Sequence, residues 1–178
     1  MNYISEIENI LKNKENFIQI EYEKTENGEQ IILTPKNHQT AVLILANILP
    51  FFLLYFYIED GLKSEQILYF FGILIFSNLL VYKYFEKLNK VTIDFKSREV
   101  KIENNSMLKK IFDKQLINFK DINYIEARHS NKQQDKFILK TTKDAEYYMF
   151  AGSTIVESSE YTKIIAKNLT DLIKSYPS

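Results

Sequence analysis

Two long uncharged stretches interrupt an otherwise mixed pattern of apolar and polar residues. The first covers residues 39–58 without a formal charge. The second covers residues 66–82 and extends to 85 once Lys83 is allowed to reach the lipid headgroups. A helix of about twenty residues is ~30 Å long, which equals the hydrocarbon thickness of a bilayer. The pattern predicts transmembrane helices at 39–58 and 66–85, with a buried helical hairpin of a soluble protein as the alternative.

Residues 59–65 connect these helices and are too few for anything but a turn, so the two helices are expected to form an antiparallel hairpin. The turn has one lysine and three acids, whereas Lys36 precedes the first helix and Lys83, Lys87 and Lys90 follow or end the second. By the positive-inside rule the turn is extracytoplasmic and both termini are cytoplasmic. The expected location is therefore the inner membrane, as a multi-pass protein.

Three residues inside the uncharged stretches are candidates for contacts between the helices. Asn47 and Asn78 lie at nearly equal depth, so their amides are placed to hydrogen-bond across the hairpin, and Gly72 would let the backbones approach. In the alternative, each asparagine bonds its own helix backbone or faces another copy of the chain. Pro50 removes one helical hydrogen bond and is expected to kink the first helix.

The residues before the first uncharged stretch predict a short helix and a β-hairpin. Apolar residues between positions 3 and 11 recur at helical spacing, and Ser5-Glu6-Ile7-Glu8 has the capping-box pattern. Alternating residues from 18 to 22 and a return strand at 31–34 flank Asn27-Gly28, the preferred pair for a type I′ turn. Residues 1–38 are thus expected to form a cytoplasmic helix and hairpin.

After the second uncharged stretch the period of the pattern changes to two. This predicts six antiparallel strands, at 91–95, 100–102, 110–117, 121–128, 137–141 and 146–150. The chain ends in a helix with an apolar stripe formed by Tyr161, Ile164, Ile165, Leu169, Leu172, Ile173 and Tyr176. Residues 86–178 are therefore expected to form a cytoplasmic β domain that the C-terminal helix caps.

The order of these elements resembles a pleckstrin-homology-like (PH-like) domain, in which a strand meander is followed by one helix. Residues 116–125, Leu-Ile-Asn-Phe-Lys-Asp-Ile-Asn-Tyr-Ile, resemble a phrase of such bacterial domains, with an aromatic residue and an aspartate before a strand. The chain is similar to small bacterial membrane-anchored PH-like proteins, including the YcxB-like group, and its layout more weakly resembles the photosystem I assembly factor family. No functional residue of either family maps onto a position here.

The fold class that follows is an α+β membrane protein with three parts. Residues 1–38 form the helix and hairpin, residues 39–85 the two-helix transmembrane hairpin with its turn at 59–65, and residues 86–178 an antiparallel PH-like β domain capped by the C-terminal helix.

The charges are distributed unevenly, although 23 basic and 23 acidic residues cancel overall. Residues 83–145 hold fifteen basic and nine acidic side chains, and Lys109, Lys110 and Lys114 are the densest cluster. A basic domain held against an anionic leaflet gains roughly 1 kcal/mol per lysine near the surface, so this cluster is a candidate patch facing lipid or a partner. The alternative is a solvated strand edge, where lysines prevent edge-to-edge aggregation. Without a recognised binding motif, nucleic acid is not expected as a partner.

Catalytic and metal-binding motifs are missing from the sequence. There is no cysteine, and the two histidines, His38 and His129, form no HExxH pattern. The four glycines are scattered, so no phosphate-binding loop can be assembled, and Ser153 lacks a Gly-x-Ser-x-Gly elbow. The sequence therefore predicts no enzyme, no catalytic residue, no metal and no cofactor.

The function expected from these observations is that of a non-enzymatic, membrane-anchored interaction module. It would present the PH-like domain at the inner membrane surface to a protein partner or to its own copies, with the lipid bilayer as its anchor. Two alternatives remain. One is a module that binds anionic lipid headgroups through the basic region, and the other is a membrane immunity or toxin-neutralising protein.

Overall fold

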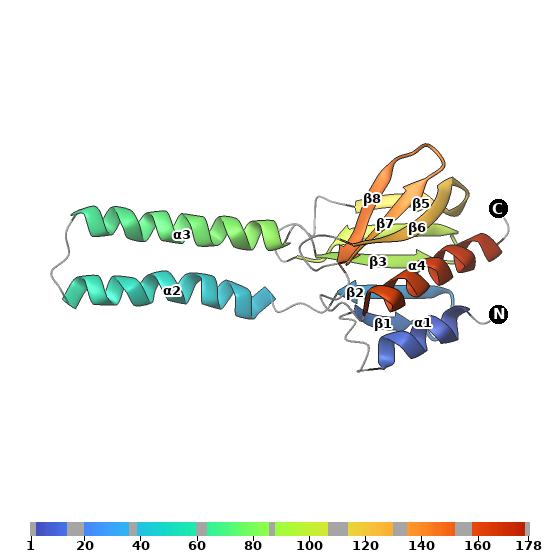
Figure 1. Cartoon of the computed structure of the whole chain (residues 1–178), viewed down its shortest axis with the longest axis horizontal. Helices are drawn as coiled ribbons and strands as arrows, with labels where there is room; N and C mark the ends of the chain where they lie inside the picture. The colour runs from blue at the N-terminus through green and yellow to red at the C-terminus, as the bar shows by residue number, and fades with distance from the viewer. Residues whose placement is uncertain are drawn as a thin grey trace.

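A pair of antiparallel helices projects from one end of a body built of β-strands and two further helices (Figure 1). The computed structural model describes residues 3–13, 20–35, 39–59, 64–85, 88–106, 114–129, 135–151 and 158–176. The projecting helices are α2 (Gln39–Glu59) and α3 (Ser64–Phe85). Within the described residues the chain is α+β, with four α-helices and eight strands in two antiparallel sheets.

The larger sheet joins residues from both sides of the helix pair. Its strands, in the order β1-β2-β3-β4-β5, are β1 (Ile20–Lys24), β2 (Gln30–Pro35), β3 (Asn89–Asp94), β4 (Glu99–Asn104) and β5 (Lys114–Asn118). Strand β2 pairs with β3 so that Ile31 lies beside Ile93 and Leu33 beside Val91, and all four side chains are buried. The alternation of apolar and polar residues puts these side chains on the same face of the sheet. The N-terminal hairpin is therefore part of the main sheet.

The turn between β1 and β2 differs from the predicted type I′ turn. A type I′ turn needs a positive φ at both central residues. Gly28 has a φ of 66°, but Asn27 is absent from the described non-glycine residues with positive φ, which are Arg98 and Asp144. Instead, the Gly28 N–H donates to the Thr25 carbonyl at 2.8 Å, and the Gln30 N–H donates to the Thr25 hydroxyl oxygen at 3.0 Å. The threonine side chain thus closes a loop longer than two residues.

The smaller sheet has three strands, in the order β6 (Ile122–His129), β7 (Asp135–Thr141) and β8 (Glu146–Ala151). A short 3₁₀ turn, η2 (Phe119–Asp121), leads from β5 into β6 and lets the chain change sheets. Strand β8 approaches the start of β3, where the Asn89 side-chain N–H donates to the Tyr148 carbonyl at 2.9 Å. The edge strand of the smaller sheet therefore contacts the start of the central strand of the larger sheet, and the two sheets share one core.

Two helices cover the open side of that core. Helix α4 (Ser158–Ser175) packs on β6, and α1 (Tyr3–Lys12) packs on α4 and β1 (Figure 1). The apolar stripe of α4 supplies Ile165, Leu169 and Ile173, which are fully buried and belong to the same cluster as Phe137 and Phe150. Burying a side chain of this size contributes roughly 1.5–3 kcal/mol. Burial of this stripe fixes α4 against the sheets.

The predicted two-helix transmembrane hairpin is wrong. Only one helix in the described residues is long and apolar enough to cross a membrane, Glu65–Tyr84 in α3, with a mean hydropathy of 1.6. The apolar stretch described in α2 is shorter, Thr40–Phe56. The predicted fold class, an α+β membrane protein with a two-helix transmembrane hairpin and a PH-like domain, is therefore corrected. The described residues form an α+β structure with four α-helices, eight strands in two antiparallel sheets and one candidate membrane span.

The predicted localisation falls with the same finding. A multi-pass protein with an extracytoplasmic turn and both termini cytoplasmic needs two helices that each span the bilayer. One candidate span among the described residues does not fit that arrangement.

Candidate functional site

The helix pair exposes an unusually large apolar surface. Among the described residues, every exposed large apolar side chain except Leu116 and Tyr161 lies on α2 or α3. Only 11% of the apolar stretch of α3 is buried, so it is not the core helix of a folded body. Soluble monomers rarely expose contiguous apolar patches of more than a few hundred Å². A surface of this kind needs lipid or protein to cover it.

The two helices hold together through few polar contacts. The Asn78 side-chain N–H lies 3.4 Å from the side-chain oxygen of Asn47, so the predicted pair is brought together. Each amide also donates to its own helix backbone at 2.8 Å, Asn47 to the Leu43 carbonyl and Asn78 to the Leu74 carbonyl. Both readings of the asparagines are thus present at once, and the bond within each helix is the shorter one.

Gly72 does not mark a close approach of the backbones. A Cβ placed on Gly72 would meet no heavy atom within 4 Å in the structure. The nearby contact between the helices is aromatic, since the rings of Phe51 and Phe70 meet edge to face with centroids 5.6 Å apart. Bulky rings, and not a small residue, therefore set the spacing of α2 and α3 there.

A second, smaller apolar cluster connects α3 to the body. Val81 near the end of α3 and Leu88 beyond it are buried, and residues at the start of α2 pack against them. The Leu88 carbonyl accepts a hydrogen bond from the Asn105 N–H at 2.6 Å, and Asn89 bonds β8 as described above. The chain that leaves α3 is therefore fixed to both sheets.

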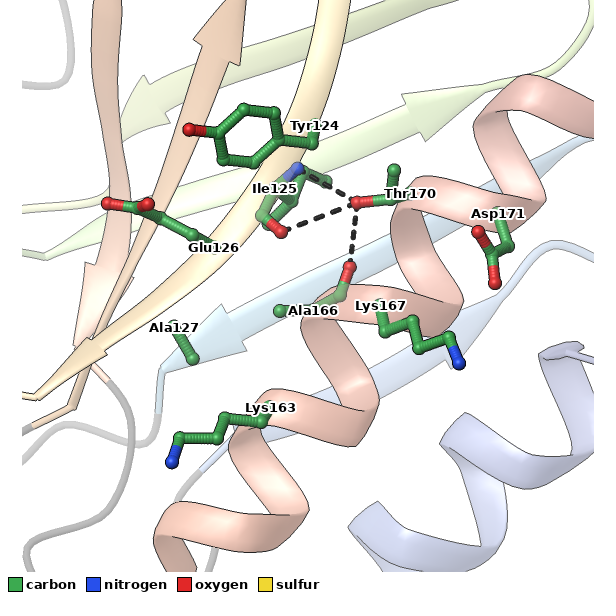
Figure 2. A pocket seen from close by; sticks show the side chains of 9 residues that line it. All are labelled: Tyr124, Ile125, Glu126, Ala127, Lys163, Ala166, Lys167, Thr170 and Asp171. Atoms are coloured by element: carbon green, nitrogen blue, oxygen red, sulfur yellow. Dashed lines mark hydrogen bonds between the residues drawn. The ribbon is translucent and has the colours of Figure 1, made fainter.

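A groove runs between β6 and α4 on the body (Figure 2). Its volume is about 320 Å³, and it is lined by Tyr124, Ile125, Glu126, Ala127, Lys163, Ala166, Lys167, Thr170 and Asp171. The floor is apolar, with Ile125 and Ala127 from the strand and Ala166 from the helix. The charged side chains of α4 stand along its helix side (Figure 2). No sequence motif pointed to this groove.

Thr170 fixes the width of the groove at one end. The Ile125 N–H donates to the Thr170 hydroxyl oxygen at 2.8 Å, and that hydroxyl donates to the Ala166 carbonyl at 2.9 Å (Figure 2). The Ile125 carbonyl lies 3.4 Å from the same oxygen. Thr170 is only 8% exposed, so these bonds are shielded from water. A single side chain thus links α4 to the backbone of β6.

The cations of the groove have no ion-pair partner in the described part of the chain. Lys163 and Lys167 are one helical turn apart, and neither forms a salt bridge or hydrogen bond there. Asp171 lies one helical turn beyond Lys167 and also lines the groove. Their positive charges are therefore available to a ligand.

The acid on the strand side, Glu126, belongs to a charge-balanced network on the outer face of the smaller sheet. Arg128 contacts Glu126 and bonds both oxygens of Glu146, at 3.1 and 3.3 Å. Lys140 also lies 3.1 Å from Glu146 and sits over the ring of Tyr124. Hydrogen bonds from Arg128 first, and then from Lys140, lower the pKa of Glu146. Glu146 in turn is the main cause that raises the pKa of both Arg128 and Lys140. The network neutralises itself, so it leaves the lysines of α4 as the open charges of the groove.

The predicted basic patch lies only partly in the described residues. Lys109 and Lys110 fall outside them, while Lys114 is exposed on β5 opposite Glu103. Lys114 lines a hollow on the outer face of the larger sheet together with two further lysines and three acids, Lys90, Lys101, Asp94, Glu99 and Glu103. Since these charges balance, this face does not favour anionic headgroups.

Candidate metal ligands do not gather in the described ranges, in which no three His, Cys, Asp or Glu side chains meet. His38 and the side chain of His129 lie outside the described residues, as does Ser153. Two buried polar side chains instead form a hydrogen bond between α4 and β7. The Thr162 hydroxyl donates to Asp135 at 2.5 Å, with both side chains buried.

Sequence reasoning missed the groove, although a signal for it was present. Thr162 and Thr170 interrupt the apolar stripe of the C-terminal helix, yet both are buried and bond to strand residues, Asp135 and Ile125. A buried polar side chain generally has a hydrogen-bond partner, so polar residues in the buried stripe pointed to specific bonds with the sheet.

Compared with known proteins, the chain matches no protein-family model and shows no significant similarity to any curated protein. The likeness to membrane-anchored PH-like proteins therefore stays a prediction.

Proposed function

We propose that the protein is a non-enzymatic interaction module that α3 anchors in a lipid bilayer and whose β-rich body binds a protein partner. Helix α2 packs beside α3, and α3 holds the body at the membrane surface. The observation that supports this proposal most strongly is the exposed apolar surface of the helix pair. Only 11% of the apolar stretch of α3 is buried.

Lipid is the covering that best fits this surface. Aromatic and aliphatic side chains point outward on α3 over its whole length, for example Leu68, Ile75 and Leu79. A helix that packs against protein on one side is expected to have polar residues on its other side, as α4 does. Helix α3 does not, since its apolar stretch runs for 20 residues from Glu65 to Tyr84.

The body supports binding better than catalysis. Its groove combines an apolar floor with two unpaired lysines, whereas the described carboxylates near it are either paired with arginine and lysine or lie at the groove rim. General acid–base catalysis needs a shielded, mutually positioned pair of groups. Peptide or protein recognition needs only shape, charge and backbone groups.

The anchor is tested by flotation of the full chain with neutral lipid vesicles after reconstitution from detergent. Wild-type protein is expected to float and to stay bound in 1 M salt, a concentration at which electrostatic contacts are screened within about 3 Å. The double variant Ile75→Lys and Leu79→Lys places two charges on the outward face of α3, each costing about 2.5–3.5 kcal/mol at the bilayer centre. It is expected to remain unbound.

The matched control is Leu116→Lys with Tyr161→Lys, which changes the two large apolar residues that are exposed in the described part of the body. This control is expected to float like wild type. Wild-type protein that stays dissolved without detergent and ignores vesicles would show that protein, and not lipid, covers α3, and the proposed anchoring would then be abandoned.

A further inference from the structure

We propose that the groove between β6 and α4 binds an extended acidic segment of a partner protein. The segment adds as a strand to the open edge of β6 and places carboxylates against Lys163 and Lys167. This inference deepens the proposed function and rests on it, because it names the surface and the partner chemistry of the interaction module.

The first support is the open edge of β6. Among the described strands, β6 pairs only with β7. The Ile125 N–H points to Thr170 and therefore away from β7. Because backbone groups two residues apart in a strand point the same way, the N–H and C=O of Ala127 face the same edge. An edge with free backbone groups is a template for another strand.

The second support is the room beside that edge. Thr170 holds α4 against Ile125 at one end of the groove, and the groove continues past Ala127 toward Lys163 (Figure 2). Ala127 carries only a methyl group, so the strand side of the groove is not filled by its own side chain. The pairing position and the space therefore occur at the same residue.

The third support is the spacing of the charges on α4. Lys163 and Lys167 are separated by about 6 Å along the helix axis. Alternate side chains on a strand are separated by about 6.6 Å, so two acids at alternate positions of an added strand lie opposite the two lysines. Asp171 follows after one more turn, which favours a basic residue at the next alternate position. The preferred pattern is acid-x-acid-x-base.

The proposal is tested with a fluorescently labelled peptide, Val-Glu-Val-Glu-Val-Lys-Val, and the full chain in detergent micelles. Binding is followed by fluorescence polarisation. Wild-type protein is expected to bind this peptide and to bind the charge-swapped peptide, Val-Lys-Val-Lys-Val-Glu-Val, about tenfold or more weakly. A version of the acidic peptide with N-methyl groups on its edge-facing amides is expected to lose binding, because it cannot pair as a strand.

Protein variants separate charge from strand addition. Lys163→Glu with Lys167→Glu is expected to weaken the acidic peptide about tenfold or more and to strengthen the charge-swapped one. Lys143→Glu with Lys174→Glu makes the same change in net charge outside the groove and is expected to leave binding unchanged. Ala127→Pro removes the edge-facing N–H at a position where an edge strand tolerates proline, and it should also abolish binding.

Equal binding of both peptides, an unaffected N-methylated peptide, or equal weakening by the Lys143 and Lys174 control would each overturn the inference. Flotation of the same preparations keeps this result separate from the anchor. Protein that floats but does not bind the peptide contradicts the groove, whereas protein that binds the peptide but does not float contradicts the membrane attachment.

Discussion

Thr170→Val tests how α4 is held against β6. Valine has nearly the shape of threonine, so the packing of α4 is kept, but the hydroxyl that accepts the Ile125 N–H at 2.8 Å is lost. This site is only 8% exposed, so the N–H is left in a shielded place without an acceptor. An unsatisfied buried donor costs about 1–3 kcal/mol, and the free energy of unfolding is expected to fall by that amount.

Urea unfolding of the full chain in detergent, followed by circular dichroism, measures this loss. Thr170→Ser is the matched control, because it keeps the hydroxyl and removes one methyl group, at a cost of about 0.8 kcal/mol. Hydrogen exchange then locates the effect. The Ile125 amide should exchange faster in the valine variant and stay protected in the serine variant. A valine variant as stable as wild type, with an equally protected Ile125 amide, would refute the role given to Thr170.

Three further results are expected. Burial raises the pKa of Tyr148 to about 12, so above pH 10 the folded state keeps the phenol proton while the unfolded state releases it. The free energy of unfolding, relative to that of Tyr148→Phe, should therefore fall between about pH 10 and 12. Unfolding experiments at several pH values measure this. The pKa of Asp94 is lowered, first by the hydrogen bond from the Ser97 N–H, so the stability that the Asp94 carboxylate provides is present above its ordinary pKa of 3.8 and is lost as the pH falls below that value. The difference in unfolding free energy between wild type and Asp94→Asn should therefore shrink in acid. A difference that stays constant with pH would contradict this. A double-mutant cycle of Asn47→Leu and Asn78→Leu in detergent should give a coupling of about 0.6 kcal/mol, because their mutual bond is long and each amide is already bonded in its own helix; a coupling of about 2 kcal/mol or more would not fit.

Local patterns predicted the elements of the body better than their assembly. The alternation at Val91 and Ile93, and again at Val100 and Ile102, corresponds to β3 and β4, and all four side chains are buried. Periodicity works here because each strand buries one face. The pairing of β2 with β3 was not predictable in the same way, since it joins residues from either side of the helix pair and depends on a core that no local pattern describes.

The helix pair shows why counting uncharged residues was insufficient. Both stretches are helical, but the count treated them as equal. In the structure only the stretch in α3 is long enough to span, and the stretch described in α2 ends at Phe56. A membrane span needs sustained apolarity as well as length, and among the described residues only Glu65–Tyr84 meets both requirements.

The candidate site was predictable only in part. Asn47 and Asn78 meet because equal depth in antiparallel helices follows from simple spacing. The groove depends on how α4 lies against β6, which is set by the burial of Ile165 and Leu169 and by the bond from Ile125 to Thr170. Those contacts connect residues that are far apart in the chain, and no motif at either end describes them.

Whether lipid covers α3 is tested most directly by spin labelling, because the chain has no native cysteine and every label site is unique. A label on Ile75→Cys, in vesicles, is expected to collide more often with oxygen, which dissolves in lipid, than with a polar nickel complex. A label on Lys143→Cys, in the exposed turn between β7 and β8, should show the reverse. A label at position 75 that meets the nickel complex as readily as the one at 143, or that neither reagent reaches, would contradict the membrane anchor.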